Sequence, residues 1–277
     1  MKETRAEHIS VNKLRPFDGH PFKVVDNEEM DQLVWSILTQ GLLTPLVVRP
    51  LDNGEYEVIS GHRRLHACRK AGIQTVPALV YAIDRDAAAI ALVDSNLHRE
   101  RILPSEKAFA YKLKLDALKH QGQTCGQVGH KSREDISDTD SGRQVQRYIR
   151  LTYLVPALLD MVDEGKIALR PAVELSYLKE PEQLELVETI AYEDATPSLA
   201  QAIKLRDFSK SGRLNADVIL SIMCEKKPNQ AEKISFRTDR LKQYLPKNIT
   251  PKETEEYVLK ALEYYHRHRA KTQNRDR

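Results

Sequence analysis

The stretch from residue 56 to residue 72 combines the features of an anion-binding turn. A β-branched run predicts a strand, and apolar residues then repeat at helical spacing until Gly72, which suits a left-handed helix end. Between them, Gly61 allows a ligand to approach the backbone, where the first N–H groups of the helix lack internal partners and favour negative charge. Arg63 and Arg64 add planar cationic groups for phosphate oxygens. On this stretch alone, a solvated helix start remains an alternative.

Three motifs follow one another in the N-terminal part of the chain. They are Gly-Leu-Leu-Thr-Pro-Leu-Val-Val-Arg-Pro at 41–50, Ser-Gly-His-Arg-Arg at 60–64 and Ser-Asn-Leu-His-Arg at 95–99. In this order and at these spacings they resemble the N-terminal domain of the ParB family of chromosome and plasmid partition proteins. The resemblance continues past residue 200, through a helix-turn-helix region and into a basic C-terminal segment. It is closest to the ParB-like proteins (ParB/RepB type) of plasmids and conjugative elements.

The resemblance implies that the N-terminal domain binds CTP together with Mg²⁺. It further implies a central domain that reads a short palindromic site in double-stranded DNA and a C-terminal domain that holds a homodimer together. Nucleotide binding would close the N-terminal domains into a clamp that slides along DNA and works with a ParA-type ATPase. Carried over residue by residue, Asn96 would face the metal. The implied nucleotide-binding residues are Thr44, Arg49, Gly61, His62, Arg63, Arg64, Ser95, Asn96 and Arg99.

Two positions depart from the family's pattern. His62 stands where the family usually has glutamate in Gly-Glu-Arg-Arg, and Ser95 stands where it usually has glutamate before the asparagine. A carboxylate lost beside the metal removes a hard oxygen ligand and a means of orienting water. Asp94 is the next residue, but on a helix its side chain points about 100° away. The outcomes left open are a weak CTPase and a protein that binds CTP without hydrolysing it.

Composition describes a soluble globular protein of two or three domains, with 277 residues, 41% of them apolar and 30% charged. No apolar run approaches the roughly 20 residues of a membrane span, and the polar residues 1–12 lack the apolar core of a signal peptide. Cys68, Cys125 and Cys224 form no Cys-x-x-Cys pair, so neither a disulfide framework nor a zinc site is indicated. We expect a cytoplasmic protein, associated with nucleoid or plasmid DNA and not with membranes.

Charge is distributed unevenly along the chain, although the net charge is only +3. Residues 155–200 hold three basic and ten acidic side chains, whereas residues 260–277 hold six basic and two acidic ones. Residues 141–153 carry three arginines and no acid. Nucleic acid would therefore meet the two basic stretches rather than the acidic one between them.

The expected fold class is α+β multidomain, beginning with a small α/β domain over residues 1–103. Asn27 and Gly41 bound an amphipathic helix. Its apolar stripe, assigned to the core, consists of Met30, Leu33, Val34, Ile37 and Leu38. The predicted strands are 8–11, 46–48, 56–59 and 76–81, and a further helix is predicted at 86–96. This arrangement would place the arginine-containing turn beside the Asn96 region.

An all-α domain is expected over residues 104–208. A helix at 106–119, with Phe109 on its apolar side, precedes a short helical piece at 132–136, a turn, and a helix capped by Ser141. That outline is typical of a helix-turn-helix. Because Arg and Gln suit guanine and adenine edges, we predict that the last helix reads DNA, with a solvated polar face as the alternative. The predicted DNA-binding residues are Arg143, Gln144, Gln146, Arg147 and Arg150.

Residues 209–232 are expected to form a linker with some helix, and residues 233–277 a small C-terminal αβ segment with a basic tail. A short strand at 233–236 and a helix beginning at Thr250 and Pro251 are predicted there. The helix carries an apolar and aromatic stripe, which needs either a second subunit or, in a monomer, its own strand as a partner. We predict a homodimer. Its contact residues are Tyr257, Val258, Ala261, Leu262 and Tyr265.

The leading functional hypothesis is a DNA-binding partition protein of a chromosome, plasmid or conjugative element, switched by CTP. The first alternative is a DNA-binding regulator or nucleoid-occlusion relative that uses the same clamp without a segregation role. The second is a nucleotide-dependent enzyme, because similar folds carry sulfiredoxin and kinase activities. Sulfiredoxins have Cys-His-Arg where this chain has Gly61-His62-Arg63, so the nucleophile is missing, and Cys68 lies more than a turn further on. A lone His62 at a phosphate turn is expected to be a hydrogen-bond donor.

Overall fold

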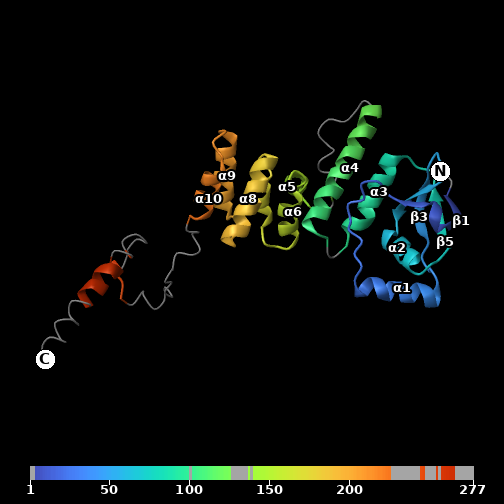
Figure 1. Cartoon of the computed structure of the whole chain (residues 1–277), viewed down its shortest axis with the longest axis horizontal. Helices are drawn as coiled ribbons and strands as arrows, with labels where there is room; N and C mark the ends of the chain where they lie inside the picture. The colour runs from blue at the N-terminus through green and yellow to red at the C-terminus, as the bar shows by residue number, and fades with distance from the viewer. Residues whose placement is uncertain are drawn as a thin grey trace, which may run out of the picture. The chain divides into compact units, whose positions relative to one another are not determined.

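The computed structural model describes residues 4–99, 102–125, 137, 140–225, 244–246, 254 and 257–265. The chain divides into two compact units, residues 1–225 and residues 226–277. The domain boundary expected at residue 103 lies inside the first unit. In this unit the residues of the sheet are followed along the chain by a series of helices (Figure 1). Within the described part of the chain, no helix is long and apolar enough to cross a membrane.

Five strands form one mixed sheet in the first unit. They are β1 (Thr4–Ser10), β2 (Leu14–Pro16), β3 (Leu46–Pro50), β4 (Tyr56–Ser60) and β5 (Thr75–Tyr81), with the 3-10 helix η1 (Val11–Lys13) between β1 and β2. Their order is β1-β5-β3-β4-β2, in which β2 on β4 and β3 on β5 are parallel and the other pairs antiparallel. The strand predicted at 8–11 instead ends at Ser10, because η1 turns the chain so that β2 pairs with β4 and buries Leu14.

Three helices accompany the sheet, α1 (Glu28–Gln40), α2 (His62–Lys70) and α3 (Arg85–Leu97). Asn27 caps α1 as predicted, its side chain accepting the Met30 N–H at 3.1 Å. Met30 and Ile37 are buried, but Leu38 is 59% exposed, so its assignment to the core is wrong. The buried side of the helix is the one that carries Met30 and Ile37. Leu38 lies about 100° further around the helix axis.

Helix α4 (Pro104–Cys125) packs along α3. Alanines of both helices meet in one apolar cluster, which allows the helices to approach closely. Within this contact the Lys114 ammonium pairs with Asp94 at 2.6 Å. Phe109, assigned to the apolar side of α4, is 41% exposed, because the buried face instead contains Ala108 and Tyr111.

In the part of the first unit that the structure describes, six helices shorter than α4 follow it and share one apolar core with Ala108 of α4. They are α5 (Gly142–Leu151), α6 (Pro156–Asp163), α7 (Leu169–Leu175), α8 (Glu180–Glu193), α9 (Leu199–Lys210) and α10 (Ala216–Met223). The polar run 209–212 suggests the start of a linker, yet residues 209–225 belong to the folded unit. The reason is the apolar face of α10, since Ile219, Ile222 and Met223 are buried in the helical core.

In the second unit, residues 257–265 are helical. Four of the five residues of the predicted dimer stripe are solvent-exposed in the single chain: Ala261, Tyr257 by 43%, Leu262 by 58% and Tyr265 by 64%. The predicted strand at 233–236, the helix start at 250–251 and the helical piece at 132–136 lie outside the described residues.

Candidate functional site

Strand β4 passes into helix α2 through a single residue, Gly61. This glycine is left-handed, with φ 102° and ψ 25°. A Cβ atom here would lie 2.5 Å from Leu46 Cδ2, so the backbone and the space both require glycine. The Gly61 carbonyl accepts the N–H of Leu65 at 2.8 Å and so starts the helix. The N–H groups of the first turn of α2 have no helical acceptor, which suits an anion.

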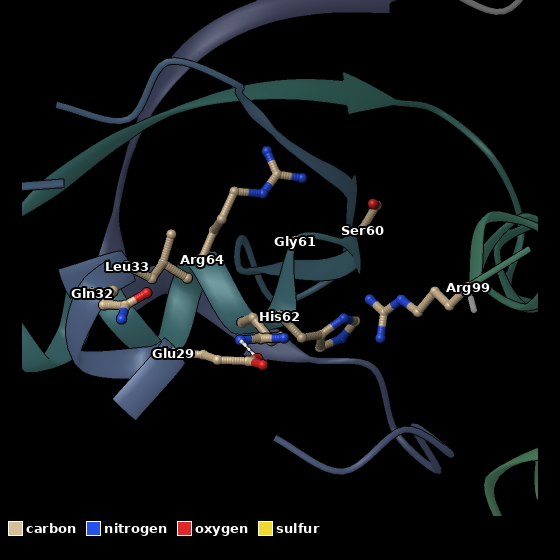
Figure 2. A pocket seen from close by; sticks show the side chains of 9 residues that line it. Glu29, Gln32, Leu33, Ser60, Gly61, His62, Arg64 and Arg99 are labelled. Atoms are coloured by element: carbon tan, nitrogen blue, oxygen red, sulfur yellow. Dashed lines mark hydrogen bonds and ion pairs between the residues drawn. The ribbon is translucent and has the colours of Figure 1, made fainter. Parts of the chain in front are cut away.

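A pocket of about 510 Å³ lies at this turn (Figure 2). It is lined by Glu29, Gln32, Leu33, Ser60, Gly61, His62, Arg63, Arg64 and Arg99. These residues come from α1, from the β4–α2 turn and from the residues that follow α3. Figure 2 shows the guanidinium group of Arg99 directed toward His62. Burial lowers the pKa of Arg99, and the positive charge of Arg63 also lowers it. The pocket therefore collects cationic groups from separate parts of the chain.

The two arginines of the turn have different partners. Arg63 Nη2 pairs with a Glu29 carboxylate oxygen at 3.1 Å, with 42% of the Arg63 side chain and 70% of the Glu29 side chain exposed. Arg64 Nη1 donates to the carbonyl oxygens of Thr44 at 2.6 Å and Pro45 at 2.9 Å, and burial lowers its pKa. In Figure 2 its side chain points away from those of Glu29 and His62. Arg64 therefore holds the segment before β3 in place. Arg63, by contrast, can exchange the Glu29 carboxylate for a ligand.

His62 is neutral and accepts a hydrogen bond. Its Nε2 accepts the N–H of Phe17 at 3.3 Å, and its ring centre lies 3.7 Å from that of His20. Burial, and after it the charges of His20 and Arg99, lower the pKa of His62 to about 3. Burial likewise lowers the pKa of His20 to about 4. Phe17 thus occupies Nε2, and donation of a hydrogen bond by His62 to a ligand stays a prediction.

Acidification should destabilise the fold through His20 and His62. Their folded pKa values, about 4 and about 3, lie below the ordinary 6.5. The unfolded chain therefore binds more protons, so their contribution is complete above pH 6.5 and is lost as pH falls toward the folded pKa values. The free energy of unfolding should fall by up to about 1.4 kcal/mol per pH unit for each histidine. Urea unfolding between pH 7 and pH 5 measures this slope, which should be shallower in His62→Gln; equal slopes would contradict the assignment.

Five of the nine predicted nucleotide-binding residues line the pocket, and four do not. Thr44 contributes the carbonyl that Arg64 binds. Arg49 Nε pairs with Glu57 at 2.6 Å, with 13% and 7% of the two side chains exposed. Asn96 is 5% exposed and donates to a main-chain carbonyl of α3 at 2.7 Å and to Ser95 Oγ at 3.2 Å. The roles of these four residues in nucleotide binding remain predictions.

Four lining residues, Glu29, Gln32, Leu33 and Ser60, are absent from the sequence-based set. Ser60 precedes Gly61 directly, so its place at the turn could have been predicted. The other three reach the pocket because α1 packs against α2, a tertiary contact with no local signal.

Helix α5 presents a polar face. The Ser141 side chain caps it by accepting the N–H of residue 144 at 3.3 Å, and Val145 is buried. All five predicted DNA contacts stay at least partly exposed, namely Arg143, Gln144, Gln146, Arg147 and Arg150. Arg150 differs, because its guanidinium group donates two hydrogen bonds to Ser176.

Comparison with known proteins places the site in context. Residues 1–97 match the model of the ParB N-terminal domain. The chromosome-partitioning protein Spo0J of Thermus thermophilus is 34% identical over 199 residues, covering 72% of this chain and 70% of that protein. A nucleoid occlusion protein of a Geobacillus species is 31% identical over 192 residues, covering 69% and 65%. A crystal structure of C-terminally truncated ParB from Caulobacter crescentus, complexed to the centromeric parS site, covers 74% of this chain and 99% of that chain, with 22% identity and a TM-score of 0.41.

Proposed function

Because this chain belongs to the ParB family of chromosome-partitioning proteins, we propose that it is a DNA-binding partition protein that CTP switches into a sliding clamp. The observation that carries the proposal is the Gly61 turn, where Arg63 and Arg99 line one pocket at a helix N-terminus. The protein would act in the cytoplasm on nucleoid or plasmid DNA, bind a palindromic centromere-like site and work with a ParA-type ATPase. The replicon is a chromosome, a plasmid or a conjugative element.

The residues of the pocket support the binding of a triphosphate. Arg63 and Arg99 supply cationic donors, and the first turn of α2 supplies main-chain N–H groups. Mg²⁺ bound with the nucleotide would neutralise part of its charge. Among the described residues no group of three His, Cys, Asp or Glu side chains could hold a metal. The resemblance implies Asn96 as a protein ligand beside the oxygens of the nucleotide, although Asn96 is 5% exposed and does not line the pocket. Ser95 in place of a glutamate supports binding with weak hydrolysis or none.

The α5 helix is the proposed DNA reader. Its N-terminal half carries arginine and glutamine side chains at the surface, and residues 141–153 contain no acid to repel phosphates. Its apolar side is fixed in the core through Val145 and Leu151. The polar face is thereby presented on a rigid element, as base recognition requires.

Replacing Arg147 by alanine should weaken specific DNA binding by about 1–3 kcal/mol. If Arg147 reads a base, the loss is confined to sequences that contain that base. If it holds a phosphate, binding to all sequences is weakened alike, and the slope of log affinity against log salt falls by about one. Fluorescence anisotropy with a palindromic duplex selected from a random pool, and with a scrambled duplex, separates these results. Arg213→Ala, in the turn between α9 and α10, is the control, and equal behaviour of both variants would remove α5 from the interface.

We also propose that the dimer contact lies in the second unit. The exposed aromatic and apolar side chains of the 257–265 helix form a surface that a twofold-related copy would cover. A dimer would also set two α5 helices against the two halves of a palindrome. Sedimentation should show a dimer for the full chain and a monomer for a chain that ends at Glu225, where the first unit ends. A shortened protein that stays dimeric without nucleotide and DNA would place the contact elsewhere.

A nucleoid-occlusion or regulatory role is the second candidate, favoured by the similarity to the Geobacillus protein. A ParA-type gene beside the gene of this protein would favour the partition role over a nucleoid-occlusion or regulatory role. The enzyme hypothesis is weakened by Cys68, which lies on the buried face of α2 and is fully buried in the core. Burial raises the pKa of its thiol, so it is not a reactive thiolate of the sulfiredoxin kind.

A further inference from the structure

Arg150, in the last turn of α5, uses its guanidinium group inside the protein. Its Nε donates to Ser176 Oγ at 3.0 Å, and its Nη2 donates to the Ser176 carbonyl oxygen at 2.8 Å. Its Cζ lies 3.9 Å from the ring centre of Tyr177 and 4.5 Å from that of Tyr153. An arginine that binds a phosphate or a base edge must direct its donors outward, whereas this side chain directs two of them to Ser176.

The acceptor, Ser176, is itself firmly placed. It is the C-cap residue of α7 and is 2% exposed, and its hydroxyl donates to the Val173 carbonyl at 2.7 Å. A cation at the end of α7 is also favoured by the negative end of the helix dipole. Arg150 therefore joins the last turn of α5 to a buried point of the helical core.

The beginning of α5 has a second polar anchor. Asp140, the residue before the N-cap, accepts the Tyr111 hydroxyl at 2.6 Å and pairs with Lys107 at 3.2 Å. Both partners lie on α4, and Tyr111 is fully buried. Because α5 is held at both ends, its rotation about its own axis is fixed, and with it the direction of its polar side chains.

We propose that Arg150 is a positioning residue for DNA reading, which fixes the orientation of α5 through Ser176 and Tyr177 and does not contact DNA itself. The inference rests on the proposed function in one respect, that α5 binds DNA. It gives Arg150 a role different from the DNA contact predicted from its place on the helix.

Anisotropy measurements on the full-length protein test this proposal at several salt concentrations. Arg150→Met and Tyr177→Leu should each lower the preference for the selected palindrome over a scrambled duplex by about fivefold to tenfold. The slope of log affinity against log salt should stay that of wild type, because no phosphate contact is removed. The double variant should lose no more than Arg150→Met alone, since that substitution already removes the contact between Arg150 and Tyr177.

The contrary results are equally specific. A salt slope lowered by about 0.9 in Arg150→Met would show a phosphate contact and overturn the proposal. An unchanged preference in Tyr177→Leu would do the same. If circular dichroism shows Arg150→Met unfolded, Ser176→Ala and Tyr177→Leu decide, because both residues lie outside α5. A wild-type protein with no preference for any duplex contradicts the proposed function as well, whereas the two results above contradict the inference alone.

Discussion

The Gly61→Ala protein is expected to lose nucleotide binding and to unfold with a free energy about 2–5 kcal/mol below that of wild type. A side chain in this left-handed conformation brings about 1–2 kcal/mol of backbone strain. The added Cβ would lie 2.5 Å from Leu46 Cδ2 and 3.1 Å from Arg64 Nη2. Overpacking at a buried residue such as Leu46 adds about 1–3 kcal/mol. Urea unfolding and calorimetric titration with CTP measure the two effects.

Gly72→Ala is the matched control. Gly72 has φ +70°, and a Cβ at this position would meet no heavy atom within 4 Å beyond its chain neighbours, so only backbone strain is introduced. Its unfolding free energy should fall by about 1–2 kcal/mol, with CTP affinity unchanged. If Gly61→Ala loses no more stability than Gly72→Ala, the contact with Leu46 is not what demands glycine. If Gly61→Ala binds CTP like wild type, the turn is not the phosphate site.

The Arg63→Ala protein should bind CTP roughly tenfold to a hundredfold more weakly than wild type. Arg63 reaches the pocket from the first turn of α2, and its pair with Glu29 is exposed enough to be exchanged for phosphate oxygens. Charge-assisted hydrogen bonds contribute about 1.5–3 kcal/mol each, which sets the size of the loss. Calorimetric titration of the two proteins with CTP gives the ratio directly.

Glu29→Gln is the control for this substitution, because it removes the carboxylate that competes for Arg63. An exposed ion pair is worth about 0–1 kcal/mol, so CTP should bind equally well or up to about fivefold more tightly. Weaker binding in Glu29→Gln would show that the ion pair orients Arg63 for the ligand rather than competing with it.

Local signals in this sequence predict local structure correctly. Asn27 and Ser141 cap helices at the expected residues, because a cap depends on one side chain and an N–H group three residues later. Gly61 is predictable for a similar reason, since the strand-to-helix turn needs a residue that tolerates positive φ. Only the family motif predicts that Arg99 lies in the pocket, because nothing in the local pattern connects this residue with the turn.

The partners of side chains that meet across the fold are not predictable in this way. His62 is expected to donate to a ligand, yet it accepts a hydrogen bond from Phe17, far away in the sequence. Arg49 and Arg150 are expected to bind ligands, yet both are engaged within the protein, one with a buried carboxylate and the other with a helix end. Periodicity shows which residues share a helix face but does not identify the neighbour that occupies it.

Titration of the full-length protein with CTP, ATP, GTP and UTP, in the presence of Mg²⁺ and with and without the selected palindrome, tests the central claim most directly. Selective binding at the Gly61 turn predicts a clear preference for CTP that is lost in Arg63→Ala and retained in Glu29→Gln. Equal affinity for all four nucleotides, or CTP binding that Arg63→Ala leaves unchanged, would contradict it.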